Sequence, residues 1–301
     1  YRLCTEQEFK GFLKSRRTSI ETDNLDQFLL HLLHFKNHYA KGPIVEVKKI
    51  LLEELICPIK AEVWEVYLDY FKRLKFFKEY EHVGGNELKW DPVLSDIAQC
   101  LMTLEGDFKV SMAFLAFWNY EIEPLILADI TAMLSIGTNY REWFKVLPLP
   151  EDFRKHFVNP YGDLVGLYYI YLNWKEDMIP KKYIEYLNLS MFKRIDVESA
   201  RYLSSPTVTK SSVCILEVAP KFKVRLDMWK NIMAVLTQIY GDQTLARKNL
   251  PMDRINKSGN HFYDFKSSEK VIYLNKITSS TFGKTSSVSY DNFLNAELIK
   301  S

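Results

Sequence analysis

The sequence predicts an all-α fold, built as an irregular helical-hairpin array or an α-solenoid-like bundle. Three observations lead to this prediction. Gly and Pro number only 11 each among 301 residues, the aromatic residues reach 14%, and apolar residues recur at helical spacing along most of the chain. With 47% hydrophobic residues the chain can also bury a substantial core.

The first part of the chain is expected to form a helix beginning near Thr5, followed by helices over residues 24–38, 44–56 and 61–80. Thr5 and Glu8 have the spacing of a capping box, in which each side chain bonds a free amide at a helix start. Gly42-Pro43 separates the second helix from the third, and Gly84-Gly85 is expected to end the fourth.

The middle of the chain is expected to contain five shorter helices, over residues 91–104, 107–121, 124–135, 164–176 and 181–192. Proline at positions 92, 124 and 180 marks three of the starts, since proline is well tolerated in a first helical turn. The segment 140–163 is rich in Pro and Gly, and it is interpreted as a hinge or a corner between sub-bundles.

The last third of the chain has a different residue composition. β-branched residues predict an extended segment near 212–218, one helix is expected at about 224–240, and eight of the twelve residues in 278–289 are Ser or Thr. That Ser/Thr-rich stretch is predicted to be a loop, because it has few apolar groups to offset the entropy cost of ordering. The predicted domains are therefore a helical-hairpin domain over 1–203 and a mixed C-terminal region over 204–301, packed on the first.

Charge excludes two classes of protein. The 40 Lys and Arg nearly balance the 38 Asp and Glu, which argues against a charged disordered chain and against a polycation that coats nucleic acid. The balance hides an asymmetry, because residues 219–301 carry +6 and residues 1–218 carry −4. The C-terminal quarter is therefore mildly basic.

Cysteine spacing and apolar runs bear on the compartment. Cys4, Cys57, Cys100 and Cys214 are far apart and form no CxxC pair, which predicts reduced thiols inside a cell. The longest apolar run, from Val110 to Trp118, is too short to cross a bilayer, so no membrane partner is expected. The chain begins at Tyr1 without a basic and then apolar leader, which indicates a fragment rather than a secreted precursor.

The most specific pattern is a row of aromatic residues at i, i+3 and i+6. It occurs at Trp64, Tyr67 and Tyr70, again from Phe114 to Tyr120, and again from Tyr168 to Trp174. Phe28, His31, His34 and Phe35 occupy the corresponding places in an earlier helix. On a helix this spacing places the rings on one face, which we expect to be buried.

The segment Val45–Arg73, reading VEVKKILLEELICP and then AEVWEVYLDYFKR, resembles half-a-tetratricopeptide repeats, helical hairpins found in RNA-processing scaffolds. The resemblance extends over about residues 20–180. It implies an α-solenoid that presents a long surface to partner proteins. Successive aromatic rows begin 36, 50 and 54 residues apart, and only the first spacing suits the repeat. An irregular helical domain without true repeats is the open alternative.

Three groups of residues are candidates for ligand binding. His31, His34 and His38 share one helical face and could bind zinc, but they also fit the pattern of rings packed at a helix interface, and the sequence favours no metal. Basic residues interleave with aromatic ones in 71–78, where Lys72, Arg73 and Lys75 could contact phosphates while rings stack on bases. Similar contacts are possible in the basic tail, at Lys221, Lys223, Arg225, Arg247 and Lys248. The alternative for both basic groups is an ordinary solvated surface.

The sequence contains no GxxxxGK[ST], GxGxxG or GxSxG motif, so neither a cofactor nor catalysis is expected. The predicted function is a non-enzymatic scaffold or adaptor that docks other protein subunits in an intracellular complex, with RNA processing or ribonucleoprotein assembly as the setting. The expected location is the nucleus rather than the cytoplasm. The alternative is a nucleic-acid-binding helical module of a chromatin or RNA complex.

Overall fold

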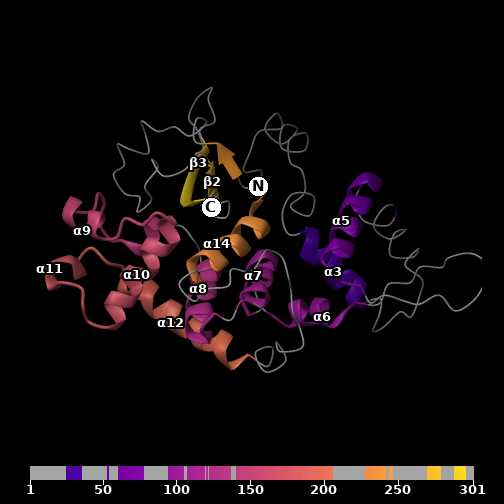
Figure 1. Cartoon of the computed structure of the whole chain (residues 1–301), viewed down its shortest axis with the longest axis horizontal. Helices are drawn as coiled ribbons and strands as arrows, with labels where there is room; N and C mark the ends of the chain where they lie inside the picture. The colour runs from indigo at the N-terminus through magenta and orange to yellow at the C-terminus, as the bar shows by residue number, and fades with distance from the viewer. Residues whose placement is uncertain are drawn as a thin grey trace, which may run out of the picture. The chain divides into compact units, whose positions relative to one another are not determined.

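The computed structural model describes residues 25–35, 53, 60–77, 94–104, 107–118, 120, 122–136, 140–205, 228–241, 244–246, 270–278 and 288–295. Helices predominate in these residues, which confirms the predicted helical class (Figure 1). The described part of the C-terminal region adds a three-stranded antiparallel sheet that the sequence analysis did not predict.

The chain divides into two compact units, Tyr1–Phe108 and Lys109–Ser301. The boundary predicted at residues 203 and 204 instead coincides with the last turn of a long helix, α12 (Leu189–Ser204). The division between the compact units therefore lies well before residue 204, where the composition of the sequence changes.

In the first unit the described helices are α3 (Leu25–Phe35), α5 (Ala61–Arg73) and α6 (Asp96–Thr103), and α3 packs against α6. Ser95 caps α6, since its Oγ accepts a hydrogen bond from the backbone N–H of Ala98 at 3.4 Å. The helix predicted from residue 91 thus begins at Asp96, one residue after this cap.

Helix α5 ends at Arg73, seven residues before the predicted end at Tyr80. Lys75 has a left-handed backbone with φ of 56°, and the N–H of Phe76 donates to the carbonyl of Phe71 at 3.0 Å. The N–H of Lys75 donates to the carbonyl of Lys72 at 2.9 Å, which completes a Schellman motif. The rings of Phe71 and Phe76 lie 5.5 Å apart and provide the hydrophobic contact that accompanies this motif. The sequence signal for this motif is a pair of apolar residues five positions apart, whereas the predicted end rested on Gly84-Gly85.

The second unit combines short helices with longer ones that are deeply buried. Its described elements are α7 (Phe108–Trp118, whose first residue belongs to the first unit), α8 (Pro124–Ile136), η3 (Tyr140–Trp143), α9 (Glu151–His156), α10 (Asp163–Lys175), α11 (Lys181–Ile184), α12 and α14 (Met228–Ile239). Helix α12 packs along α8, and Trp229 of α14 donates a hydrogen bond to the Tyr169 hydroxyl of α10 at 3.0 Å. Phe114 of α7 is fully buried and its ring lies 5.1 Å from that of Tyr202 in α12, so the core of this unit lies among α7, α8, α10, α12 and α14.

One expectation for the second unit needs detail and another was wrong. The segment 140–163, interpreted as a hinge or a corner between sub-bundles, contains η3 and α9, and acidic residues begin α9 while basic residues end it, as the helix dipole favours. The single helix predicted over 181–192 is two helices. Phe144 forms a β-bridge with Leu187, and this pairing separates α11 from α12.

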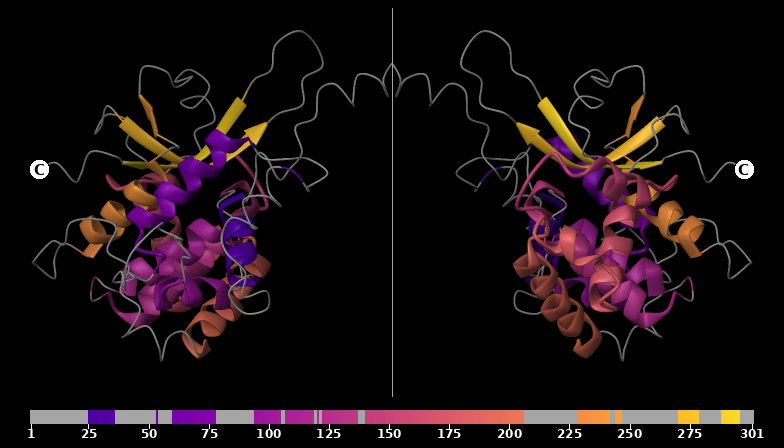
Figure 2. Two further views of the ribbon diagram at one scale, coloured as in Figure 1. Left: turned by 90° about the vertical axis from the view of Figure 1, so that its right-hand side faces the viewer. Right: turned by 90° about the vertical axis from the view of Figure 1, so that its left-hand side faces the viewer.

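The sheet has the order β1 (Thr244–Ala246), β2 (Lys270–Thr278), β3 (Val288–Asn295), and all neighbours are antiparallel. Figure 2 shows β2 and β3 side by side in two views, and β3 lies against α10. Val271 and Ile272 are both buried although successive strand residues point to opposite faces. The first part of β2 is therefore covered on both faces.

Several expectations lie outside the described residues. They are the helix near Thr5, the helix 44–56 apart from Glu53, the extended segment 212–218, and residues 279–287 of the Ser/Thr-rich loop. The ends of that predicted loop are strand, since Thr278 belongs to β2 and Val288 and Ser289 belong to β3. The helix expected at 224–240 is confirmed as α14.

The predicted burial of the aromatic rows varies between helices. Phe114, Phe117 and Tyr120 are all buried, as expected. In α3 the expectation was wrong, because the helix buries leucines and leaves His31 exposed. A leucine stripe at positions 25, 29, 30 and 33 shares that helix with the aromatic and histidine row, and it is the more apolar of the two.

Candidate functional site: a polar network on three helices

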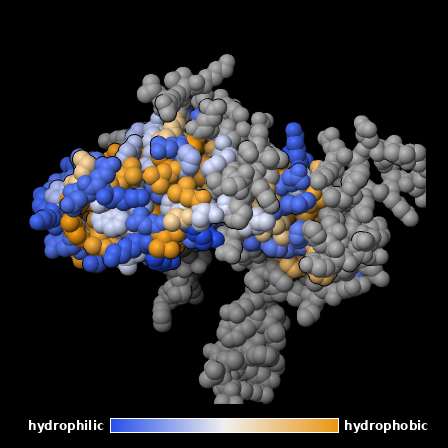
Figure 3. All heavy atoms as spheres, turned by 90° about the horizontal axis from the view of Figure 1, so that it is seen from below, coloured by the Kyte–Doolittle hydropathy of each residue, from blue (hydrophilic) through white to orange (hydrophobic). Residues whose placement is uncertain are grey.

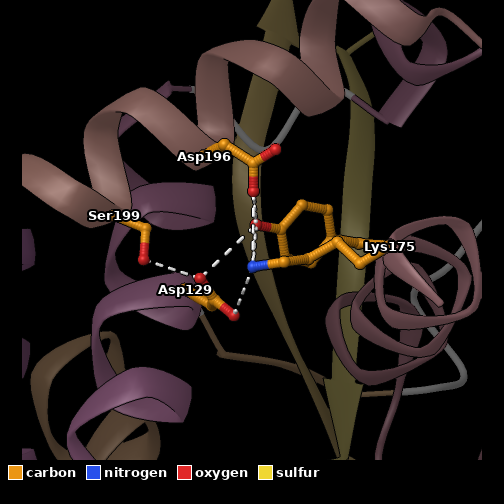
Figure 4. A network of polar contacts seen from close by, with 5 residues as sticks. Asp129, Lys175, Asp196 and Ser199 are labelled. Atoms are coloured by element: carbon orange, nitrogen blue, oxygen red, sulfur yellow. Dashed lines mark hydrogen bonds and ion pairs between the residues drawn. The ribbon is translucent and has the colours of Figure 1, made fainter.

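A polar network lies where α8, α10 and α12 meet. Asp129 of α8, Tyr171 and Lys175 of α10, and Asp196 and Ser199 of α12 contact one another. Figure 4 shows the side chains of Asp129, Lys175, Asp196 and Ser199 directed toward a common point. Lys175 follows Tyr171 by four residues and Ser199 follows Asp196 by three, so each pair lies on one face of its helix. The network therefore joins one side chain of α8 to two from each of the other helices.

Asp129 is fully buried. Its Oδ1 accepts a hydrogen bond from the Ser199 hydroxyl at 2.6 Å, and its Oδ2 lies 3.9 Å from the Lys175 ammonium nitrogen. That second distance is too long for a hydrogen bond, but attraction between the charges remains. Burial raises the pKa of the Asp129 carboxyl, and the Ser199 hydrogen bond and the Lys175 charge oppose that rise.

Tyr171 is fully buried and links the two acids. Its hydroxyl donates to Asp196 Oδ1 at 2.5 Å and lies 3.4 Å from Asp129 Oδ1. One hydroxyl has one proton, so the shorter contact is the principal bond. Lys175 donates to the same hydroxyl oxygen at 3.1 Å and forms an ion pair with Asp196 at 3.3 Å. The pKa of Tyr171 is raised, first by burial and then by its hydrogen bond to Asp196.

This arrangement suits a structural role, in which the network holds the helices together, better than it suits acid–base catalysis. A tyrosine that acts as a base needs a lowered pKa, whereas burial and two carboxylates keep the Tyr171 hydroxyl protonated. Ser199 donates its proton to a carboxylate whose raised pKa reflects burial, and within the described residues no imidazole stands beside it. The donors and acceptors are directed at one another, so together they fix the relative positions of α8, α10 and α12.

The sequence indicated Tyr171 as part of an aromatic row but did not predict the network. A signal was present in α8, whose sequence PLILADITAMLSI contains a single charged residue, Asp129. A lone carboxylate in an apolar helix needs a buried partner. The partners on α12 could not be found in this way, because Asp196 and Ser199 lie among many other polar residues.

Lys72, Arg73 and Lys75 are brought together where α5 ends, and all three are exposed. Arg73 forms an ion pair with Asp69 at 3.5 Å. The neighbouring rings of Phe71 and Phe76 are buried, so they are not available to stack on bases. The structure thus leaves the cations of this predicted interface exposed and removes two of its aromatic residues. Lys221, Lys223, Arg225, Arg247 and Lys248 lie outside the described residues.

The histidine cluster is only partly described. His31 is exposed, His34 is half-buried, and His38 lies outside the described residues. In the part of the chain that the structure describes, no three His, Cys, Asp or Glu side chains are grouped so as to hold a metal.

Cys100 corrects the expectation of reduced thiols, because it is disulfide-bonded. The other three cysteines lie outside the described residues. Cysteines far apart in sequence can meet in a fold, and spacing along the chain could not show this pairing. Disulfides persist mainly in oxidising compartments.

No protein-family model matches the chain, and no curated protein matches it. The resemblance to half-a-tetratricopeptide repeats therefore stays a prediction. Among the helices that the structure describes, none combines the length and the apolar character needed to cross a membrane.

Proposed function

We propose that the chain is a non-enzymatic scaffold or adaptor subunit that docks protein partners in a multiprotein complex. The polar network carries this proposal. Its five side chains hold three helices together and bond one another, as suits a rigid platform whose outer faces meet partners.

Exposed apolar side chains on the second unit support a docking role. Val146, Met178 and Val197 are 52%, 63% and 72% exposed, well above what a core residue shows. Figure 3 shows hydrophobic patches between hydrophilic ones on the face viewed from below. Exposed apolar groups rimmed by polar ones are typical of protein interfaces.

The proposed setting is RNA processing or ribonucleoprotein assembly, on the basis of the resemblance in Val45–Arg73. The disulfide at Cys100 argues against a nuclear location, because thiols are kept reduced there. Mass spectrometry after alkylation of the unreduced full chain distinguishes a nuclear location from an oxidising compartment. Alkylation of all four cysteines would favour the nucleus, and protection of Cys100 would favour an oxidising compartment.

A nucleic-acid-binding module is the second candidate, because Lys72, Arg73 and Lys75 are exposed within four residues of one another. The same cations also suit the C-terminal end of α5, where the helix dipole attracts positive charge without any ligand. Salt dependence distinguishes these explanations, since phosphate contacts weaken steeply as salt concentration rises.

The test is purification of the tagged full chain from its source, with quantitative mass spectrometry and mild crosslinking. We expect one or more protein partners to copurify in near-stoichiometric amounts, and their recovery should not change after nuclease treatment. Recovery of the chain without a stoichiometric partner would contradict the proposal. Nuclease-sensitive recovery, lost on changing Lys72, Arg73 and Lys75 to Glu, would favour the nucleic-acid module instead.

A further inference from the structure

Helix α12 has two contrasting faces. The inner face is buried and consists of Met191, Phe192, Ile195, Ser199 and Tyr202. Residues at the complementary helical spacing are exposed, and we call them the outer face of α12: Ser190, Lys193, Arg194, Val197, Ala200 and Ser204. In Figure 1 this helix runs along the lower side of its unit, the side from which Figure 3 is viewed.

The acidic residues of α12 are already engaged. Asp196 accepts a hydrogen bond from Tyr171 and forms an ion pair with Lys175 in the polar network. Glu198 forms an ion pair with Arg201 at 2.5 Å and accepts a hydrogen bond from Ser135 at 3.2 Å. Within the described residues Lys193 and Arg194 have no ion-pair partner, so the outer face carries two uncompensated positive charges.

The outer face also has an apolar centre. Val197 is 72% exposed and lies one helical turn after Lys193 and Arg194. Ala200 and Ser204 continue the same face and are small, so another helix can approach α12 closely there. An apolar side chain beside two free cations is complementary to a helix that presents apolar residues at i, i+3 and i+4 next to carboxylates.

We propose that the outer face of α12 binds an acidic amphipathic helix of a partner protein. The apolar residues of the partner pack on Val197 and Ala200, and its carboxylates pair with Lys193 and Arg194. This inference rests on the proposed docking function, for which it names the surface and the partner chemistry. A nucleic acid fits less well, because two cations can contact only a few phosphates and the apolar Val197 beside them cannot bond the sugar-phosphate backbone.

The experiment uses the full chain and three labelled probes in a fluorescence anisotropy titration. The first is a synthetic helical peptide with Leu on one face and Glu beside it, the second has Lys in place of Glu, and the third is a short single-stranded RNA. We expect only the acidic peptide to bind. Binding by neither peptide, or stronger binding by the basic peptide or the RNA, overturns the proposal.

Variants locate the binding. K193E/R194E should weaken binding of the acidic peptide by about tenfold or more, and V197D should weaken its binding by a similar factor. The matched control K145E/K181E reverses two exposed charges outside α12 and should change affinity by less than about twofold. Equal losses in the control and in K193E/R194E would show general attraction to positive charge and would refute a site on α12.

The proposed function and this site can fail separately. All substitutions are at exposed positions, so circular dichroism and thermal unfolding should match those of the wild type. If stoichiometric partners copurify equally with wild type and with K193E/R194E, docking stands and the outer face of α12 is not the surface. If no partner copurifies with either, the proposed function itself fails.

Discussion

Helices α5 and α10 carry the same aromatic spacing and the same type of C-terminal turn, but their surroundings differ. In α5 the first ring, Trp64, is buried and the next two are half-buried. In α10 the first two rings are buried and only Trp174 is half-buried. Burial therefore depends on how many elements surround a helix, which ring spacing does not encode.

The rest of each helix explains the contrast. Glu62, Glu65 and Asp69 are exposed along α5, so this helix has one buried side. Residues 163–168 of α10 are buried in an unbroken run, so this helix is enclosed on most sides. An enclosed helix must also provide partners for its polar groups, and the Tyr171 hydroxyl has them in Asp196 and Lys175.

The largest expected difference concerns the second ring of each row. Tyr171→Ala removes a fully buried ring and its network, and it should lower the free energy of unfolding by about 3–5 kcal/mol. Tyr67→Ala removes a half-buried ring and should cost about 1–2 kcal/mol. Chemical denaturation of both variants provides the measurement. Equal costs would mean that the two helices are enclosed to the same degree.

A smaller effect is expected from pH. Because the pKa of Asp129 is raised above 3.8 in the fold, the folded state holds its proton to higher pH than the unfolded chain does. The contribution of Asp129 to stability is therefore greatest below 3.8 and falls as pH rises through the raised pKa, by at most about 1.4 kcal/mol per pH unit.

Asp129→Asn isolates this effect. The variant cannot titrate at this position, so its stability relative to wild type should increase as pH rises from about 4. Urea denaturation of both proteins across a pH series measures the difference. A constant difference, or one with the opposite slope, would show that the folded state does not raise the pKa of Asp129.

The smallest effects are expected where the two helices end. Lys75 after α5 and Asp177 after α10 have φ values of 56° and 53°, and both occupy the left-handed position of a Schellman motif. Lys75→Gly should stabilise the protein by about 0.5–1 kcal/mol, because glycine adopts this conformation without strain. Asp177→Gly should gain less, because Asp tolerates the left-handed region better than Lys does.

Lys72→Gly is the matched control for these substitutions. It lies in the last turn of α5, where glycine should destabilise by about 0.5–1 kcal/mol. Thermal unfolding of the three variants reports the differences. Destabilisation by Lys75→Gly would mean that position 75 does not adopt the left-handed conformation.

The sequence predicted the helical class and most helix positions in the described part of the chain, because apolar periodicity and Pro starts are local signals. It did not predict the end of α5 at Arg73, since the Schellman motif there uses Lys rather than Gly. It also missed β2 and β3, whose pairing joins Val271 to Asn295 across a long separation. The polar network was hidden for the same reason, because Ser199 and Asp129 are 70 positions apart.

The central claim is that the network fixes α8, α10 and α12 as one platform. Tyr171→Phe tests it, because this change keeps the ring and removes only the hydroxyl that joins Asp196 and Lys175. Hydrogen exchange measured by mass spectrometry should show backbone amides of all three helices losing protection together, while Tyr67→Phe in α5 changes none of them. Loss of protection confined to α10, or no loss at all, would contradict the claim.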